Sequence, residues 1–160
     1  MSPLAEELHF GFLGPYRVAG MGEPWLAKME TTHRFLRGQG IGAVVTLTED
    51  DLYGHLHRAA RFLHLHVPVD DGEPPDPDGT GRILRFIDAC LERDTGVAVH
   101  CLEGRGRTGT VLCAWLGVRE SLGSEDAIRR IRDLRPCTAL APSQQGFLHR
   151  YLSGFGRRAV

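Results

Sequence analysis

The sequence predicts an α/β fold with a central, mostly parallel sheet of about four to five strands and helices on both faces. Short apolar runs that are typical of buried strands, such as 43–47 and 97–100, alternate with amphipathic stretches of helical length, such as 80–93. The run at 97–100 leads through a glycine-rich loop directly into another helical pattern. In open parallel sheets, loops at the carboxyl ends of the strands bind ligands, so we expect the functional site there.

Composition and charge are those of an ordinary globular protein. Hydrophobic residues make up 42% of the 160 residues and the formal net charge is −1, so nothing drives the chain toward nucleic acid or a membrane surface. No apolar run approaches the roughly 18 residues that span a bilayer, and no secretory signal pattern is seen. The four cysteines lack metal or disulfide spacing, which favours a cytoplasmic compartment. We expect residues 1–160 to form one domain, monomeric and without metal or cofactor.

Five extended apolar segments predict the strands of the sheet, at 8–13, 16–18, 43–47, 62–69 and 97–100. Amphipathic segments predict five helices, at 24–38, 80–93, 108–121, 124–135 and 142–155. Trp25 is expected on the apolar face of the first helix, and Ser124 is the expected N-cap of the fourth. The charged stretch 48–61 is a helix or a turn, and 156–160 is a frayed tail.

Two groups of polar residues fit ordinary structural roles. In the alternating segment 62–69, Leu63 and Leu65 lie on one face, and His64 and His66 lie on the other, exposed or in contact with a loop. Barrel hydrolases use such a histidine pair to bind metal, but they need about 250 residues. We interpret the basic run of the fourth helix as a solvated face, with guidance of an anionic substrate as the alternative. That run comprises Arg129, Arg130, Arg132 and Arg135.

The stretch VAVHCLEGRGRTGT, residues 97–110, contains the main candidate site. A strand ends at His100 and Cys101, a glycine-rich loop follows, and a helix begins near Arg107 and Thr108. The residues between Cys101 and Arg107 are few enough to curl into a single ring of backbone N–H groups. Such a ring at a helix N-terminus binds a dianion. The candidate phosphate-binding residues are Leu102, Glu103, Gly104, Arg105, Gly106 and Arg107.

These residue types fit nucleophilic chemistry on a phosphate. A helix N-terminus with nearby cations lowers the pKa of a cysteine from about 8.5 to roughly 3.5–7.5, which makes the thiolate available for attack. The forked guanidinium of Arg107 holds two oxygens at once, and the loop amides bind the charge of the transition state. Thr108 places a hydroxyl beside the Cys101 sulfur, where it helps the thiolate leave. His100 orients the loop and tunes the sulfur rather than transferring protons.

Two rival interpretations of the same residues are weaker. Residues 104–109 also match G-x-G-x-x-G, the dinucleotide fingerprint, but the chain beyond them lacks the second strand and the acid expected about 20 residues later. A buried structural cysteine beside a glycine turn accounts for Cys101 but accounts for neither Arg107 nor His100.

The pattern His-Cys-x5-Arg-Thr-Gly at 100–109 resembles the signature loop of cysteine-dependent protein tyrosine and dual-specificity phosphatases. Every defining position matches, and the likeness covers most of the chain. It is closest to the small atypical dual-specificity phosphatases, with secondary similarities to the regenerating-liver and cell-cycle types. The resemblance implies a protein tyrosine phosphatase-like fold and hydrolysis through a phosphocysteine, with no metal required.

The resemblance also implies a carboxylic acid on the loop after the preceding strand, in a stretch similar to Asp-x-x-Pro. On composition alone, the segment 69–78 is a solvated turn, but its position makes it the expected acid loop. Asp71 is our choice of general acid and Asp70 the second choice. The cell-cycle type further implies a glutamine that places the hydrolytic water at the start of the last helix, here Gln144 or Gln145.

The predicted function is hydrolysis of phosphomonoesters, on phosphotyrosine and also on phosphoserine or phosphothreonine of proteins. A small phosphomonoester is a further expected substrate. The alternatives are a phosphoinositide phosphatase, a catalytically silent phosphate-binding module, and other Cys-x5-Arg chemistry such as sulfur transfer or arsenate reduction. Arg105 matches the second loop lysine of the phosphoinositide phosphatases, whereas Leu102 does not match the first. Glu103 opposes anion binding unless its side chain points outward.

Overall fold

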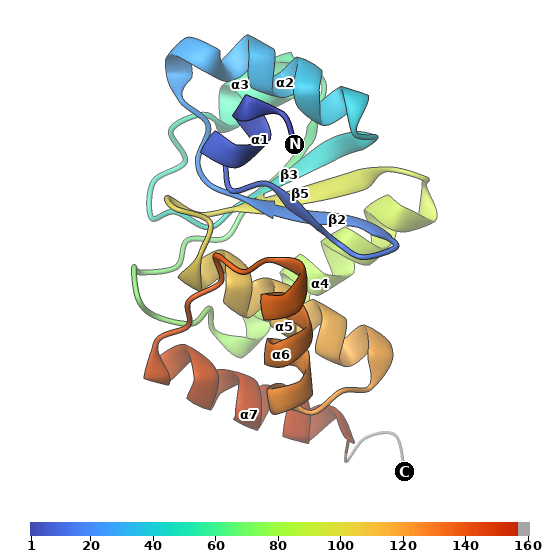
Figure 1. Ribbon diagram of the computed structural model, residues 1–160, viewed down its shortest axis with the longest axis vertical. Coiled ribbons are helices and arrows are strands. Elements are labelled where there is room, and N and C mark those ends of the chain that lie inside the picture. Colours follow the sequence, from blue (N-terminus) through green and yellow to red (C-terminus); the bar gives the residue numbers. More distant parts are fainter. Residues whose placement is uncertain (157–160) are drawn as a thin grey trace.

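The computed structural model describes residues 1–156, which form a five-stranded sheet between two layers of helices (Figure 1). The strand order is β1-β2-β5-β3-β4, in which β1 and β2 pair antiparallel and all other neighbours are parallel. In chain order the elements are α1 (Pro3–Glu7), β1 (Gly11–Leu13), β2 (Tyr16–Met21), the 3-10 helix η1 (Leu26–Lys28), α2 (Met29–Gly38), β3 (Ile41–Thr46), α3 (Gly54–Ala59), β4 (Leu63–His66), α4 (Pro77–Glu92), β5 (Gly96–His100), α5 (Gly106–Glu120), α6 (Ser124–Leu134) and α7 (Pro142–Gly156).

Alternation along the central strands separates two hydrophobic cores. Val97 and Val99 of β5 face the larger core, which α4, α5, α6 and α7 cover, whereas Ala98 faces the smaller core beneath α2. Figure 1 shows α1, α2 and α3 on one face of the sheet and α4 to α7 on the other. Every residue of α5 from 107 to 117 is buried, because this helix is covered by the sheet and by its neighbouring helices. The predicted fold class is confirmed.

Some local expectations are wrong, and each difference has a physical reason. The segment 8–13 is extended only over β1, because residues 8–10 form the turn that ends the short helix α1. Leu8 N and His9 N donate to the Leu4 and Glu6 carbonyls, and His9 has a φ of +48°. Ser124 is not the N-cap of α6, since Gly123 takes that position without a side-chain hydrogen bond. Leu63, on the apolar face of the alternating segment, is 46% exposed, because β4 is an edge strand.

Two further side chains differ from expectation. Trp25 precedes η1 and is exposed, although its spacing favours the apolar face of a helix. Arg135 belongs to a run that predicts a solvated face, and the structure buries it. No helix within residues 1–156 is long and apolar enough to cross a membrane. Of the predicted tail, Gly156 ends α7 and the remaining four residues lie outside the described part of the chain.

Candidate active site

The loop predicted to bind phosphate connects the carboxyl end of β5 to the N-terminus of α5. Because β5 lies between β2 and β3 and runs parallel to both, the loop occupies the edge of the sheet where α/β proteins bind ligands. Four of the predicted site residues, His100, Cys101, Arg107 and Thr108, are buried at this junction. Cys101 itself is 3% exposed.

Hydrogen bonds hold the carbonyl groups of the loop away from its centre. Each carbonyl accepts from a donor outside the ring: Cys101 from His100 Nδ1 (3.1 Å), Leu102 from Glu23 N (2.9 Å), Glu103 from His9 Nδ1 (2.9 Å), Gly104 from Arg135 Nη2 (3.0 Å), Arg105 from Gly109 N (3.2 Å) and Gly106 from Thr110 Oγ1 (2.8 Å). In a trans peptide the C=O and the following N–H point in opposite directions, so the amides of 102–107 turn inward. Within residues 1–156, the amides of 102–105 donate to no protein group. They therefore form a nest for an oxyanion.

One glycine is essential to this geometry. Gly104 has a φ of +75°, and a Cβ at this position would lie 2.4 Å from the carbonyl carbon of Met21 in the neighbouring strand β2. Any side chain would therefore push the loop off the end of the sheet.

The Cys101 sulfur receives a hydrogen bond from the first turn of α5. Thr108 Oγ1 donates to Cys101 Sγ over 3.1 Å. The positive end of the α5 dipole lies at the same place, and both features stabilise negative charge on the sulfur. The structure thus brings the predicted nucleophile and its predicted hydroxyl partner together.

The Arg107 guanidinium connects the loop to two carboxylates. Its Nη1 donates to Glu49 Oε2 and to the Val69 carbonyl, both at 2.9 Å, and its Nη2 lies 3.4 Å from Asp71 Oδ1. Glu49 Oε1 in turn accepts from the Asp71 amide at 3.0 Å. Glu49 therefore ties the arginine to the acid loop. Hydrogen bonds from its own backbone amide and from Arg107 hold the pKa of Glu49 below its usual value.

Glu49 is a site residue that the sequence interpretation missed. It lies in the charged segment after β3, which is typical of a solvated helix or turn. One signal was present: β3 runs parallel to β5, so the residues that follow both strands meet at the same edge of the sheet.

A directed chain of hydrogen bonds ends at the Cys101 carbonyl. A carbonyl only accepts, so His100 carries its proton on Nδ1, and its Nε2 accepts from Thr46 Oγ1 at 2.9 Å. The same hydroxyl then accepts from His64 Nε2 at 2.9 Å, whose Nδ1 accepts from Arg58 Nη1 at 3.2 Å. Burial lowers the pKa of His100 to about 4, so this ring is neutral near pH 7 and orients the loop.

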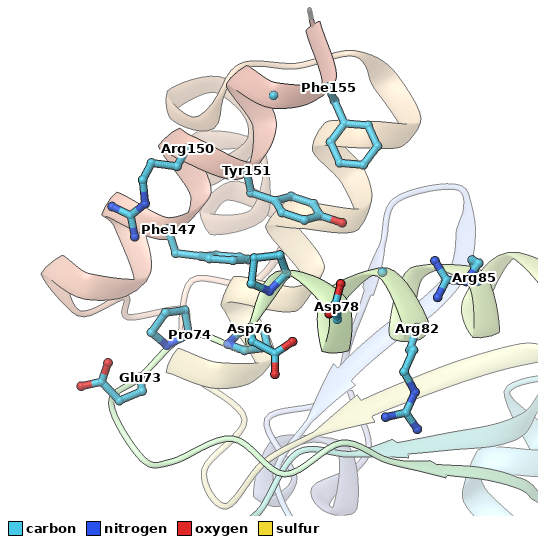
Figure 2. A pocket seen from close by; sticks show the side chains of 14 residues that line it. Glu73, Pro74, Asp76, Asp78, Arg82, Arg85, Phe147, Arg150, Tyr151 and Phe155 are labelled. Atoms are coloured by element: carbon cyan, nitrogen blue, oxygen red, sulfur yellow. The ribbon is translucent and has the colours of Figure 1, made fainter. Parts of the chain in front are cut away.

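The acid loop between β4 and α4 is held by α7. Gln144 Oε1 accepts from Ala141 N at 2.9 Å, and its Nε2 donates to the Glu73 carbonyl at 3.2 Å. Ser143 Oγ donates to the Gly72 carbonyl at 3.0 Å. Figure 2 shows Glu73 and Pro74 of this loop across a groove of about 940 Å³ from the stacked aromatic residues of α7. Two segments that are distant in sequence are thus fixed to each other beside the phosphate loop.

Of the remaining predicted residues, some lie against the phosphate loop and others point away from it. Gln144 is buried, and its amide would contact a Cβ placed on Gly106, so it lies against the loop. Gln145 instead donates to the Leu140 carbonyl and is exposed. The side chain of Glu103 is mostly exposed and lies 3.9 Å from Arg105, so its charge is directed outward. Asp70 makes no ion pair with Arg107 within residues 1–156.

A family model described as "Polymorphic toxin system, DSP-PTPase phosphatase" matches residues 19–120. The chain belongs to this family. The dual specificity protein phosphatase CDC14C of Homo sapiens is 24% identical over 135 residues, which cover 84% of this chain and 30% of that protein. The structure of Tk-PTP in its active form is 26% identical with a TM-score of 0.82, over 96% of this chain and 99% of that one. PTPMT1 in complex with PI(5)P is 20% identical with a TM-score of 0.84, over 94% and 99%.

For this member of the DSP-PTPase family, the predicted family and the phosphatase-like fold are confirmed. The chain spans less than a third of the length of CDC14C. Within residues 1–156, no group of three or more His, Cys, Asp or Glu side chains is arranged to hold a metal ion.

Proposed function

We propose that this chain hydrolyses phosphomonoesters through a phosphocysteine formed on Cys101. One observation carries the proposal: the loop carbonyls from 101 to 106 are all bonded outward, around a sulfur that a hydroxyl donor already contacts. A ring of inward amides next to a nucleophile fits a tetrahedral dianion and its more highly charged transition state. Membership of the DSP-PTPase family and the likeness to Tk-PTP support the same activity.

In the first step, the Cys101 thiolate attacks phosphorus and the bond from phosphorus to the leaving oxygen breaks. Asp71 gives its proton to that oxygen, and its position beside Arg107 supports this role. Arg107 Nη1 is anchored by Glu49 and Val69. The edge formed by Nη2, which lies 3.4 Å from the exposed Asp71 carboxylate, and Nε would bind two phosphate oxygens.

In the second step, water attacks phosphorus and returns its proton to Asp71. The bond from phosphorus to sulfur breaks, and the sulfur leaves as a thiolate that the Thr108 hydroxyl stabilises. Gln144 lies against the loop and contacts the acid loop, which supports its role in placing this water.

Phosphorylated proteins are the substrates that the surroundings of the loop favour. A depression of about 720 Å³ beside the loop is lined by Trp25, Leu26 and Leu102, whose exposed apolar side chains suit a polypeptide better than a charged headgroup. The exposed carboxylate of Glu103 neutralises Arg105 and repels additional phosphates. Phosphoinositides remain the second candidate, because PTPMT1 is similar in fold and its structure was solved with PI(5)P.

Comparison of three substrates tests this function: a phosphotyrosine peptide, a phosphothreonine peptide and a phosphoinositide. We expect phosphate release from the peptides at a higher kcat/KM than from the lipid. Cys101→Ser should abolish release while binding of vanadate persists. Turnover by Cys101→Ser would contradict the phosphocysteine, and preference for the lipid would favour the second candidate.

A further inference from the structure

Arg135, directly after α6, is the most deeply buried charged group that the proposed mechanism does not use. It is 2% exposed, and its guanidinium lies behind the phosphate loop. Nη2 donates to the Gly104 carbonyl at 3.0 Å and to the His9 carbonyl at 2.8 Å. Its Nε and Nη1 are buried and have no hydrogen-bond partner within residues 1–156. Buried polar groups are normally paired, so two unpaired donors on one guanidinium require a physical cause.

The charge of Arg135 is also uncompensated. Arg107 has the carboxylates of Glu49 and Asp71 at 2.9 and 3.4 Å, whereas no carboxylate forms an ion pair with Arg135 within the described residues. An unpaired buried cation is costly, and strongly perturbed charged groups cluster at functional sites. Burial lowers the pKa of Arg135, and only thiol groups, those of Cys137, Cys101 and Cys113, oppose this effect. Arg135 Nη2 binds the carbonyl of Gly104, which lies in the loop that begins at Cys101, so the candidate nucleophile and this unpaired cation are joined by one loop.

The surrounding chain is shaped to hold this guanidinium in one place. A Cβ on Gly20 would lie 2.6 Å from Arg135 Cζ, and a Cβ on Gly11 would lie 3.1 Å from its Cγ. The two glycines of β1 and β2 thus form a slot that the side chain fills. A cation fixed in this way stabilises an anion without having to be reoriented during the reaction.

We propose that Arg135 is a positioning residue whose buried charge is the fixed counter-ion of the Cys101 thiolate, and whose hydrogen bond turns the Gly104 carbonyl away from the bound anion. The inference deepens the proposed function, because it concerns the same nucleophile. It assigns the two cations different roles: Arg107 binds the phosphate oxygens, and Arg135 stabilises the sulfur from behind. The other titratable or charged groups around this loop are His9, Glu23, Glu49, Asp71, His100, Glu103, Arg105, Cys113 and Cys137.

The test measures the thiolate directly, without relying on turnover. Wild-type, Arg135→Lys and Arg135→Met proteins are alkylated with iodoacetamide across pH, and modification of the Cys101 peptide is followed by mass spectrometry. We expect the alkylation midpoint to rise by about one pH unit or more in Arg135→Met and by much less in Arg135→Lys, which keeps the charge. Arg132→Met is the matched control, since Arg132 is exposed on α6, three residues before Arg135, and its loss should not move the midpoint.

Turnover of an aryl phosphate at pH 6 gives the second measurement. We expect kcat/KM to fall at least about tenfold in Arg135→Met and to recover in part in Arg135→Lys. A folded Arg135→Met protein with an unchanged midpoint would overturn the inference. If that variant does not fold, Arg135→Gln replaces it, and equal midpoints for Lys and Gln would overturn the role of charge. A wild-type protein that shows a low midpoint but no turnover would contradict the proposed function and leave the role of Arg135 standing.

Discussion

The contacts of Asp71 distinguish it from the other acidic residues of the acid loop. Its carboxylate is exposed, yet its amide is bound by Glu49 and its side chain lies near Arg107, so the loop is held over the candidate site. Asp70 next to it has no such ion pair within the described residues, and its carbonyl accepts from Glu73 N inside the loop's own turn. These contacts favour Asp71 as the general acid.

Leaving groups of different basicity test this assignment. We expect Asp71→Asn to lower kcat/KM on a phosphotyrosine peptide by roughly 10²–10⁴, because the tyrosine oxygen then leaves without a proton. The loss should be much smaller for an aryl phosphate whose phenol is strongly acidic, since that oxygen leaves as an anion. Asp70→Asn is the control and should retain activity on both substrates; the reverse result would move the general acid to Asp70.

The site residues that sequence reasoning identified are close together in the chain. Cys101, Arg107 and Thr108 occupy one strand–loop–helix unit, whose glycines and apolar runs indicate its shape locally. Glu49 and Arg135 were not identified, because they meet the loop across 58 and 31 residues of chain. The sequence around an isolated glutamate or arginine in a charged segment does not indicate a buried contact, and such residues are ordinarily expected to be exposed to solvent.

At the scale of elements, the attachment of α7 to the acid loop would couple the two proposed catalytic steps. The Ser143 hydroxyl and the Gln144 amide bind consecutive carbonyls of the loop, at Gly72 and Glu73. Helix α7 packs on α5, the helix that begins at the phosphate loop. The loop that carries the proposed proton donor and the loop that carries the candidate nucleophile therefore both pack against α7.

Burst kinetics separate the two glutamines. Gln144→Ala should slow phosphocysteine hydrolysis by about tenfold to a hundredfold, because the attacking water loses its placement. Stopped-flow measurement with an aryl phosphate should then show a burst of phenol followed by a slow steady rate. Gln145→Ala is the control, since that side chain binds Leu140 on the outer side of the helix start. A burst in Gln145→Ala alone would exchange the two roles.

The elements themselves were predictable where periodicity was strong. Helices α4 and α5 and strand β5 lie within two residues of their expected ends at most boundaries, since each has a long apolar stripe or run. The differences concern features that depend on neighbours in space. β4 is an edge strand and exposes Leu63, and α1 has five residues, too few to show a period.

At the scale of the whole molecule, buried histidines make folding sensitive to acid. Burial lowers the pKa of His57 to about 3 and that of His100 to about 4. In an unfolded chain both groups titrate near 6.5. Below that pH the unfolded state therefore binds protons that the folded state does not bind. The contribution of these two neutral histidines to stability is fully present above about pH 6.5 and is lost as the pH falls toward the folded values, by up to about 1.4 kcal/mol per pH unit for each histidine.

Urea unfolding at several pH values measures this effect. We expect the midpoint to fall from pH 6.5 to pH 4.5 and to change little between pH 7 and pH 8. The variant His57→Gln removes one of the two groups and should show a shallower fall over the same range. Equal slopes for the wild type and the variant would show that other groups, and not this histidine, cause the acid sensitivity.

The N-terminal segment also belongs to the support of the phosphate loop. The His9 ring donates to the Glu103 carbonyl, and the His9 backbone carbonyl holds Arg135. The family match, in contrast, starts at residue 19. A protein that started at that boundary would lose both contacts together with α1, β1 and the first half of β2. Weak activity of such a shortened protein would therefore not count against the proposed function.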